Sequence, residues 1–320
     1  MLYIFLLIIS FFLTYLIKNY AIKKSLIDIP NKRSSHSTPT PHGGGIAIAV
    51  TWFIGISYLF FADQIESSLY FALMFGVVIS VVSYFDDLHK LSVKLRFFTQ
   101  IIVAVIGLFF LGGFGELSFG FFSIENQIIT NLFALFLIVW YINLYNFLDG
   151  IDGYAGSEAI FLGFAGYILF SGNAFLVLIA SVIGFLFWNW NKAKIFMGDV
   201  GSTLLGYNVA IFTIFYANQK PDYFWIWIIL FGVYWFDATL TLIRRKFSGE
   251  KLSQAHKKHA YQRLNQSGWS HYKVTNYAIG LNLVLFLIVY FIGNLLLAFL
   301  LSLIVLFLSM KFVDSKKRFS

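Results

Sequence analysis

Two adjacent acids, Asp86 and Asp87, follow directly on a long apolar run. Neighbouring carboxylates repel one another, so both stay ionised mainly where a divalent cation or basic groups lie nearby. Lys90 and Lys94 follow closely and can supply positive charge. A solvated turn at a helix end is the alternative. The pair favours a place where a metal ion or bases meet an anion.

A second polar group repeats at three-residue intervals. Asn143, Asn146, Asp149 and Asp152 follow one another at this spacing, so successive pairs are neighbours on one helical stripe. The stripe runs out of an apolar segment into a glycine-rich break, and polar groups there are costly unless they are paired or used. Hydrogen bonding between helices would explain Asn143. Two acids beside three glycines favour a binding site.

Asp199 stands at the start of a later apolar run, in the sequence Gly198-Asp199-Val200-Gly201. The free backbone N–H groups and the positive dipole end of such a helix start attract anions. The carboxylate of Asp199 can ligate a metal ion that bridges to the anion. The alternative is that Asp199 only caps the helix.

Two basic segments can supply counter-charge. Residues 28–45 combine prolines and glycines with Lys32, Arg33 and His36. These residue types make a stiff loop whose backbone can approach an anion closely. A plain, positively charged cytoplasmic loop is the alternative.

The second basic segment holds His256 and His259, followed by Arg263. The two histidines could share a helix face and bind a metal. A zinc site is disfavoured, however, because the chain has no cysteine and no third ligand lies nearby. Contact with phosphate groups is favoured over contact with anionic lipid headgroups.

Asp237 and Arg244 lie seven residues apart near the end of another apolar run. This spacing places both on one helix face. Either they flank the same site as the other groups, or they form a structural ion pair. The sequence leaves both readings open.

The elements that position these groups are membrane helices. Hydrophobic residues make up 59% of the 320, charged residues only 12%, where a soluble domain would have about a quarter charged. Apolar runs long enough to cross ~30 Å of hydrocarbon recur throughout, and we expect one all-α domain over residues 1–320 with about eleven spans. The expected windows are 2–18, 43–61, 69–84, 97–112, 128–145, 157–171, 174–190, 202–217, 223–241, 275–292 and 294–310.

Charge orients this bundle. Of the 23 lysines and arginines, 22 fall between spans on one side, which leaves Lys220 alone on the other. The positive-inside rule makes the crowded side cytoplasmic, with the N-terminus outside and the C-terminus inside. All six histidines and ten of the fifteen acids fall on the cytoplasmic side as well. Reactive groups gathered at one face indicate an interfacial enzyme, whereas a carrier needs a polar path through the middle.

Taken together and in this order, the five segments between residues 28 and 263 resemble the polyprenyl-phosphate N-acetylhexosamine-1-phosphate transferases of glycosyltransferase family 4. The closest likeness is to the branch that initiates O-antigen and teichoic acid synthesis. The resemblance implies a polytopic bundle in the bacterial inner membrane with its active site at the cytoplasmic face. It also implies Mg2+, with Mn2+ as an alternative, and transfer of a sugar 1-phosphate from a UDP-N-acetyl sugar to undecaprenyl phosphate with release of UMP.

The resemblance also implies roles for individual residues. Asp199 would ligate the metal, and Asp86 and Asp87 would form the catalytic acidic pair near metal and lipid phosphate, Asp86 as a further ligand. His259, or else His256, matches the histidine motif of the family, with His-Lys-Lys-His where many members carry a denser cluster. The implied substrate-binding residues are His36, Lys90, Lys94, Asn143, Asn146, Asp149, Asp152, His256 and Arg263.

Two other functions remain open from the sequence. Asp149-Gly-Ile-Asp152-Gly is similar to a motif of CDP-alcohol phosphotransferases, but the rest of that motif is missing. A cation-coupled transporter would explain spans and acids, yet it predicts ionisable residues near mid-bilayer and internal repeats. Expected partners are the two substrates, membrane lipids and a second copy in a homodimer, with no nucleic acid. The identity of the sugar and of the polymer stays open.

Overall fold

The computed structural model describes every residue except 31–34, 36, 37, 253, 255 and 320. Within the described residues the chain is almost entirely helical, which confirms the predicted all-α membrane fold. The helices are α1 (Leu2–Lys23), α2 (Gly45–Phe61), α3 (Ser67–Met74), α4 (Gly76–His89), α5 (Val93–Phe110), α6 (Gln127–Phe147), α7 (Tyr154–Phe170), α8 (Asn173–Asn189), α9 (Asp199–Gln219), α10 (Asp222–Leu230), α11 (Gly232–Phe247), α12 (Ala260–Gln266), α13 (His271–Phe291) and α14 (Leu295–Lys316).

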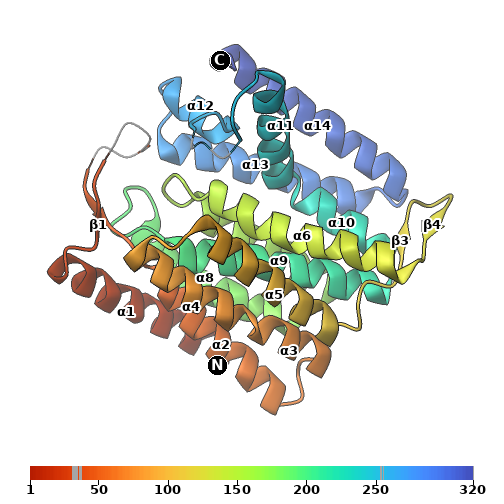
Figure 1. The fold of residues 1–320 in the computed structure, drawn as a ribbon, viewed down its shortest axis with the longest axis horizontal. Coiled ribbons are helices and arrows are strands. Elements are labelled where there is room, and N and C mark those ends of the chain that lie inside the picture. The colour runs from red at the N-terminus through yellow and green to blue at the C-terminus, as the bar shows by residue number, and fades with distance from the viewer. Residues whose placement is uncertain (31–34, 36–37, 253, 255, 320) are drawn as a thin grey trace.

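Two short antiparallel hairpins mark the two ends of the bundle. Strands β1 (Ile27–Asp28) and β2 (Thr40–Pro41) pair beside the end of α1. Strands β3 (Leu117–Ser118) and β4 (Ser123–Ile124) pair at the opposite end (Figure 1). The first hairpin lies at the end that carries most of the predicted site residues.

Each predicted window overlaps one of these apolar helices, with α3–α4 and α10–α11 each filling one window. Among the described residues, seven helical segments are long and apolar enough to cross a membrane, or eight if α10 and α11, bent by 75°, count as one span. Helices α2, α7 and α8 are apolar but have only 17 residues each, about 25 Å at 1.5 Å per residue. The exact number of spans and their orientation stay predictions.

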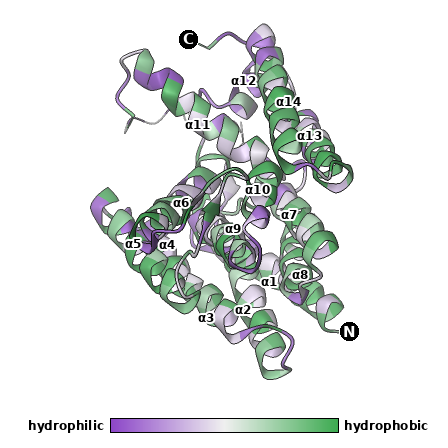
Figure 2. Ribbon diagram, turned by 90° about the vertical axis from the view of Figure 1, so that its right-hand side faces the viewer, coloured by the Kyte–Doolittle hydropathy of each residue, from purple (hydrophilic) through white to green (hydrophobic). Residues whose placement is uncertain are grey.

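Helix α9 is the centre of the bundle. In the most apolar 18-residue stretch of α9, 100% of the residues are buried, whereas the share is 17% in α1 and 28% in α13 and α14. Helices α2, α4 and α6 pack directly on α9. Apolar colour dominates outer helices such as α3 and α14 in Figure 2, whereas α11 and α12 carry more hydrophilic colour.

The N-terminal ends of α2 and α9 touch through two glycines. A Cβ atom on Gly45 would lie 2.5 Å from Cα of Gly201, closer than side chains tolerate. The contact is reinforced because the N–H group of Gly45 donates to the carbonyl of Met197 at 2.8 Å. Small residues allow such close backbone approach between membrane helices. The contact fixes Asp199, which opens α9, against the loop that follows β2.

Gly45→Ala is expected to lower the midpoint of thermal unfolding in detergent. The added methyl group meets backbone atoms that cannot rotate away, and overpacking of this kind costs about 1–3 kcal/mol. The control is Gly280→Ala in α13, where nothing lies within 4 Å of the new atom. Equal unfolding midpoints for the two variants would contradict this account of the α2–α9 contact.

Candidate active site

A polar cavity of about 760 Å3 opens where the ends of α4, α6 and α9 meet the first loop. Segments more than a hundred residues apart in sequence therefore share one space. Six predicted site residues line it: Asp86, Asp87, Lys90, Asn146, Asp149 and Asp199.

Asp199 is held in place from a neighbouring helix. Asn146 Nδ2 on α6 donates to Asp199 Oδ1 at 2.9 Å and lies 3.0 Å from the hydroxyl of Ser202. Gly198, with φ of +77°, lets the chain turn into α9 while passing close to Asp87. A Cβ atom there would lie 3.0 Å from Asp87 Oδ2. The loop before α9 thus brings Asp87 and Asp199 to the same wall of the cavity.

The two adjacent acids have different partners. Asp86 is buried, accepts a hydrogen bond from Leu91 N at 2.7 Å and forms an ion pair with Arg96 at 3.0 Å. Asp87 is half-buried and forms no ion pair with a described residue. Arg96 therefore compensates the charge of Asp86, whereas Asp87 accepts a hydrogen bond from the backbone N–H group of Asp199.

Asp149 adds a further acid at the same place. Its burial, and the neighbouring charge of Asp199, raise the pKa of Asp149 to about 7. A bound cation would oppose both effects and favour the ionised carboxylate. The acids facing the cavity are oxygen donors, the ligand type that Mg2+ prefers.

No three histidine or acidic side chains among the described residues are arranged as a complete metal site. Mg2+ commonly takes only one or two carboxylates and completes its shell with water and substrate phosphates. Asp199 fits a site of that incomplete kind, with Asp87 beside it in place of the predicted Asp86, which is engaged by Arg96.

A second cavity of about 480 Å3 adjoins the first. Asp86, Arg96, Asn146 and Asp199 line both spaces. The second cavity continues between α4, α5 and α11, where its walls are largely apolar. Its apolar lining includes Ile79, Val82, Val93, Phe97, Phe147 and Leu242.

His256, His259 and Asn143 also line the second cavity. Asn143 Nδ2 donates to Gln100 Oε1 at 2.7 Å, so it makes the inter-helix hydrogen bond considered from the sequence. Burial, together with the neighbouring His259 ring, lowers the pKa of His256 to about 4. His256 is accordingly neutral near pH 7.

Of the predicted site residues, three line neither cavity and a fourth lies outside the described residues. Lys94 is exposed and lines neither of the two cavities. Asp152 also lies outside both linings; its carboxylate accepts from Ala193 N at 3.1 Å and lies 3.1 Å from His271 Nδ1. His36 lies outside the described residues.

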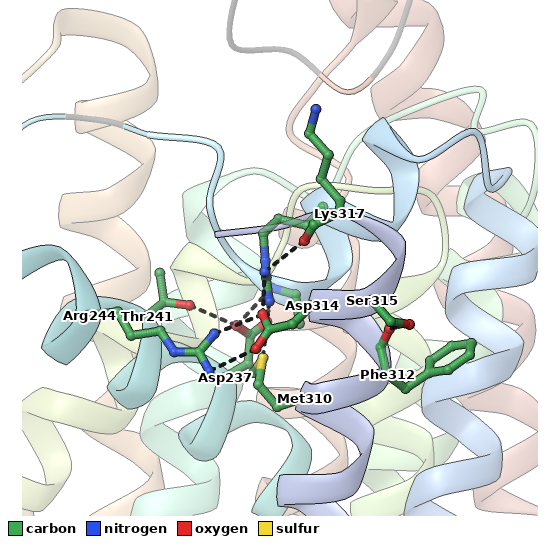
Figure 3. Close-up of polar contacts among 10 residues, drawn as sticks. Asp237, Thr241, Arg244, Met310, Phe312, Asp314, Ser315 and Lys317 are labelled. Atoms are coloured by element: carbon green, nitrogen blue, oxygen red, sulfur yellow. Dashed lines mark hydrogen bonds and ion pairs between the residues drawn. The ribbon is translucent and has the colours of Figure 1, made fainter. Parts of the chain in front are cut away.

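Arg263, the third residue that lines neither cavity, faces the C-terminal helix. Its Nη1 contacts Asp314 Oδ1 at 2.6 Å, and its side chain is almost fully buried. Arg244 contacts both oxygens of the same carboxylate at 2.9 and 3.0 Å (Figure 3). Arg244 therefore forms an ion pair with Asp314 on α14, and the ion pair with Asp237 considered from the sequence is wrong.

Several lining residues escaped the sequence prediction. Arg96, His42 and Gln262 all face the first cavity. Arg96 follows Lys90 and Lys94, and His42 lies in the basic segment 28–45, but the spacing of neither residue indicates a site. Gln262 carries no signal beyond its place three residues after His259.

Comparison with known proteins gives consistent matches. A model described as "Glycosyl transferase family 4" matches residues 68–217. A Bacillus subtilis protein named "Probable undecaprenyl-phosphate N-acetylglucosaminyl 1-phosphate transferase" is 34% identical, over 81% of this chain and 75% of that protein. A Yersinia pestis undecaprenyl-phosphate alpha-N-acetylglucosaminyl 1-phosphate transferase is 30% identical, over 84% and 77%. A Staphylococcus carnosus phospho-N-acetylmuramoyl-pentapeptide-transferase is 29% identical, over 75% and 80%.

Proposed function

The chain belongs to the polyprenyl-phosphate N-acetylhexosamine-1-phosphate transferases of glycosyl transferase family 4, and from this premise we propose the reaction that it performs. It transfers an N-acetylated sugar 1-phosphate from a UDP-sugar to undecaprenyl phosphate and releases UMP. The relatives named for N-acetylglucosamine make UDP-N-acetylglucosamine the first donor to test. Membership of the family favours this reaction over CDP-alcohol phosphotransfer and over transport.

The observation that carries the proposal is the pair of joined cavities. The first is polar and lined by acids, with Lys90 and Arg96 among them, which suits a nucleotide diphosphate bound with a cation. The second has largely apolar walls and leads away between α4, α5 and α11, which suits the prenyl chain of the acceptor. The acids and Arg96 shared by both spaces lie where the two phosphate groups would meet.

The chemistry follows from these charges. A phosphate monoester has a second pKa near 6 and is mostly dianionic at pH 7, so its oxygen can attack the sugar-bearing phosphorus. A new P–O bond forms to the lipid phosphate as the P–O bond to the α-phosphate breaks, and that bond's electron pair leaves with UMP. The difficulty is the crowding of negative charge, which Lys90 at the first cavity offsets in part.

A divalent cation held by Asp199 and Asp87 would neutralise further phosphate charge. We place the enzyme in the bacterial inner membrane with both cavities opening towards the cytoplasm, where UDP-sugars occur. This orientation follows from the positions of the lysines and arginines. The reaction would be the first membrane step of cell-envelope polysaccharide synthesis.

A label at the β-phosphate of the UDP-sugar tests which bond breaks. We expect the label to move into the lipid while the α-phosphate departs in UMP. The measurement is partition of the label between organic and aqueous phases after incubation of purified protein with undecaprenyl phosphate. Because one pyrophosphate bond replaces another of similar energy, added UMP should regenerate UDP-sugar. Recovery of the label in free UDP would instead show cleavage of the sugar's anomeric C–O bond.

A further inference from the structure

The two ring nitrogens of His259 have different surroundings. The residue lies directly before α12, is 3% exposed and stacks near the ring of Phe147. Nδ1 is fully enclosed and has no partner within hydrogen-bond limits among the described residues, although the backbone N–H group of Gln262 faces the same side chain in a capping box. His259 nevertheless lines the second cavity. Nε2 is accordingly the ring nitrogen that can reach a bound molecule.

The group nearest to the enclosed nitrogen is a carboxylate on another helix. Asp237 Oδ1, on α11, lies 3.6 Å from His259 Nδ1, and both side chains are no more than 5% exposed. The backbone N–H group of Ala260 points at the same carboxylate, 2.8 and 2.9 Å from its two oxygens. Thr241, labelled beside Asp237 in Figure 3, donates to Oδ1 at 3.1 Å.

These hydrogen bonds do not saturate the carboxylate. An ionised aspartate has about four lone-pair sites. One N–H group and one hydroxyl group supply only two protons, although the N–H lies near both oxygens. At least one lone pair remains for a proton on Nδ1. Contacts of this kind are often long without substrate and shorten when it binds.

Other charged groups near the ring are already engaged. Arg245, on α11, is bound by Glu250 at 2.9 Å and by backbone carbonyl groups of the loop after α11. His256, whose ring centroid lies 4.8 Å away, accepts through its Nδ1 from the N–H of Lys258. Across the cavity lie Asp86 with Arg96, and Asp199. Asp237 is therefore the carboxylate placed to act on Nδ1.

We propose that Asp237 is a positioning residue that acts through His259. Its carboxylate holds a proton on Nδ1 and turns Nε2 towards the cavity. When the phosphate arrives as the monoanion, the minor form at pH 7, its proton moves to Nε2, and the resulting imidazolium lies between Asp237 and the phosphate dianion. This inference rests on the proposed function for its phosphate ligand but not for the pairing of the two side chains.

The first test reads the ring directly and needs no turnover. In protein carrying 15N-labelled histidine in lipid nanodiscs, with the His259 signals assigned from His259→Gln, Nδ1 should carry the proton. Adding inorganic pyrophosphate should protonate Nε2 as well, and Asp237→Asn should remove that response. A proton on Nε2 alone in the wild-type protein would overturn the pairing, whether or not the protein transfers sugar phosphate.

The second test uses kinetics. Asp237→Asn should lower kcat by about 10- to 100-fold with little change in KM for the UDP-sugar, the range seen when a histidine loses its orienting partner. In a His259→Gln background the same substitution should cost almost nothing further. Independent, multiplying losses would show that Asp237 does not act through His259.

Thr241→Val is the matched control. It removes the other side-chain hydrogen bond to Asp237 but leaves the carboxylate and the Ala260 contact in place. We expect kcat to change less than threefold. A loss as large as that of Asp237→Asn would mean that Asp237 serves only to hold α11 against α12. Absence of all transfer by the wild-type protein would refute the proposed function and leave the ring measurement to decide the pairing.

Discussion

Asp199→Asn is expected to reduce sugar-phosphate transfer by at least about 100-fold while the protein stays folded. The substitution removes the negative charge that the cavity offers to a cation, at a position that faces both cavities. The fold should survive, because the amide oxygen can still accept the hydrogen bond from Asn146 Nδ2. The measurement is the initial rate of UMP release in nanodiscs, with circular dichroism as the check on folding.

Asp63→Asn provides the control for this loss. Asp63 is exposed in the loop after α2 and takes a left-handed conformation, φ of +54°, which asparagine also tolerates. Its turnover should match that of the unaltered protein. Near-normal turnover in Asp199→Asn would remove Asp199 from the reaction, and with it the metal site suggested at the start of α9.

Removal of divalent cations with EDTA should stop the reaction to a similar degree. The physical reason is that Asp87, Asp149 and Asp199 line one cavity, whereas the ion pair of Arg96 goes to Asp86. Two highly charged phosphate substrates add to this excess of negative charge. UMP release should fall at least about 100-fold on chelation and return when Mg2+ is supplied in excess. Mn2+ should restore part of it.

Two outcomes would refute this metal requirement. One is an unchanged rate in EDTA after the protein has been dialysed against the chelator. The other is full recovery of the rate when the EDTA is removed and no divalent cation is added. Direct measurement of Mn2+ binding, in the unaltered protein and in Asp199→Asn, separates loss of the ion from loss of a later step.

The apolar helices could be predicted because each is a continuous local run of apolar residues. The convergence of Asp87, Asn146 and Asp199 was suggested by their places at apolar segment ends. Their shared cavity depends on the contact of Gly45 with Gly201, which brings two loops together. No short stretch of sequence records that contact, since its two halves are more than 150 residues apart.

Partners of charged groups were the hardest feature to predict. Arg263 was assigned to substrate because it lies in a basic loop, yet in the structure it binds Asp314, 51 residues away. The sequence groups Asp86 with its neighbour Asp87. In the structure the ion-pair partner of Asp86 is Arg96, across the turn between α4 and α5. Lys90, left-handed at φ of +50°, forms part of that turn. The spacing of residues along one helix gives no information about contacts with a different helix that follows a turn or a longer connection.

The meeting of a polar and an apolar-walled cavity at Asp86 and Asp199 has a consequence for how the enzyme senses its substrates. In the proposed reaction the nucleotide sugar comes from solution, so its supply is a concentration. The prenyl acceptor comes from the lipid bilayer, so its supply is a number of molecules per unit area of membrane. Addition of inert phospholipid to the membrane therefore lowers the surface density of the prenyl acceptor and leaves the concentration of the nucleotide sugar unchanged. In the proposed reaction the rate would therefore depend on the area of the membrane that carries the acceptor.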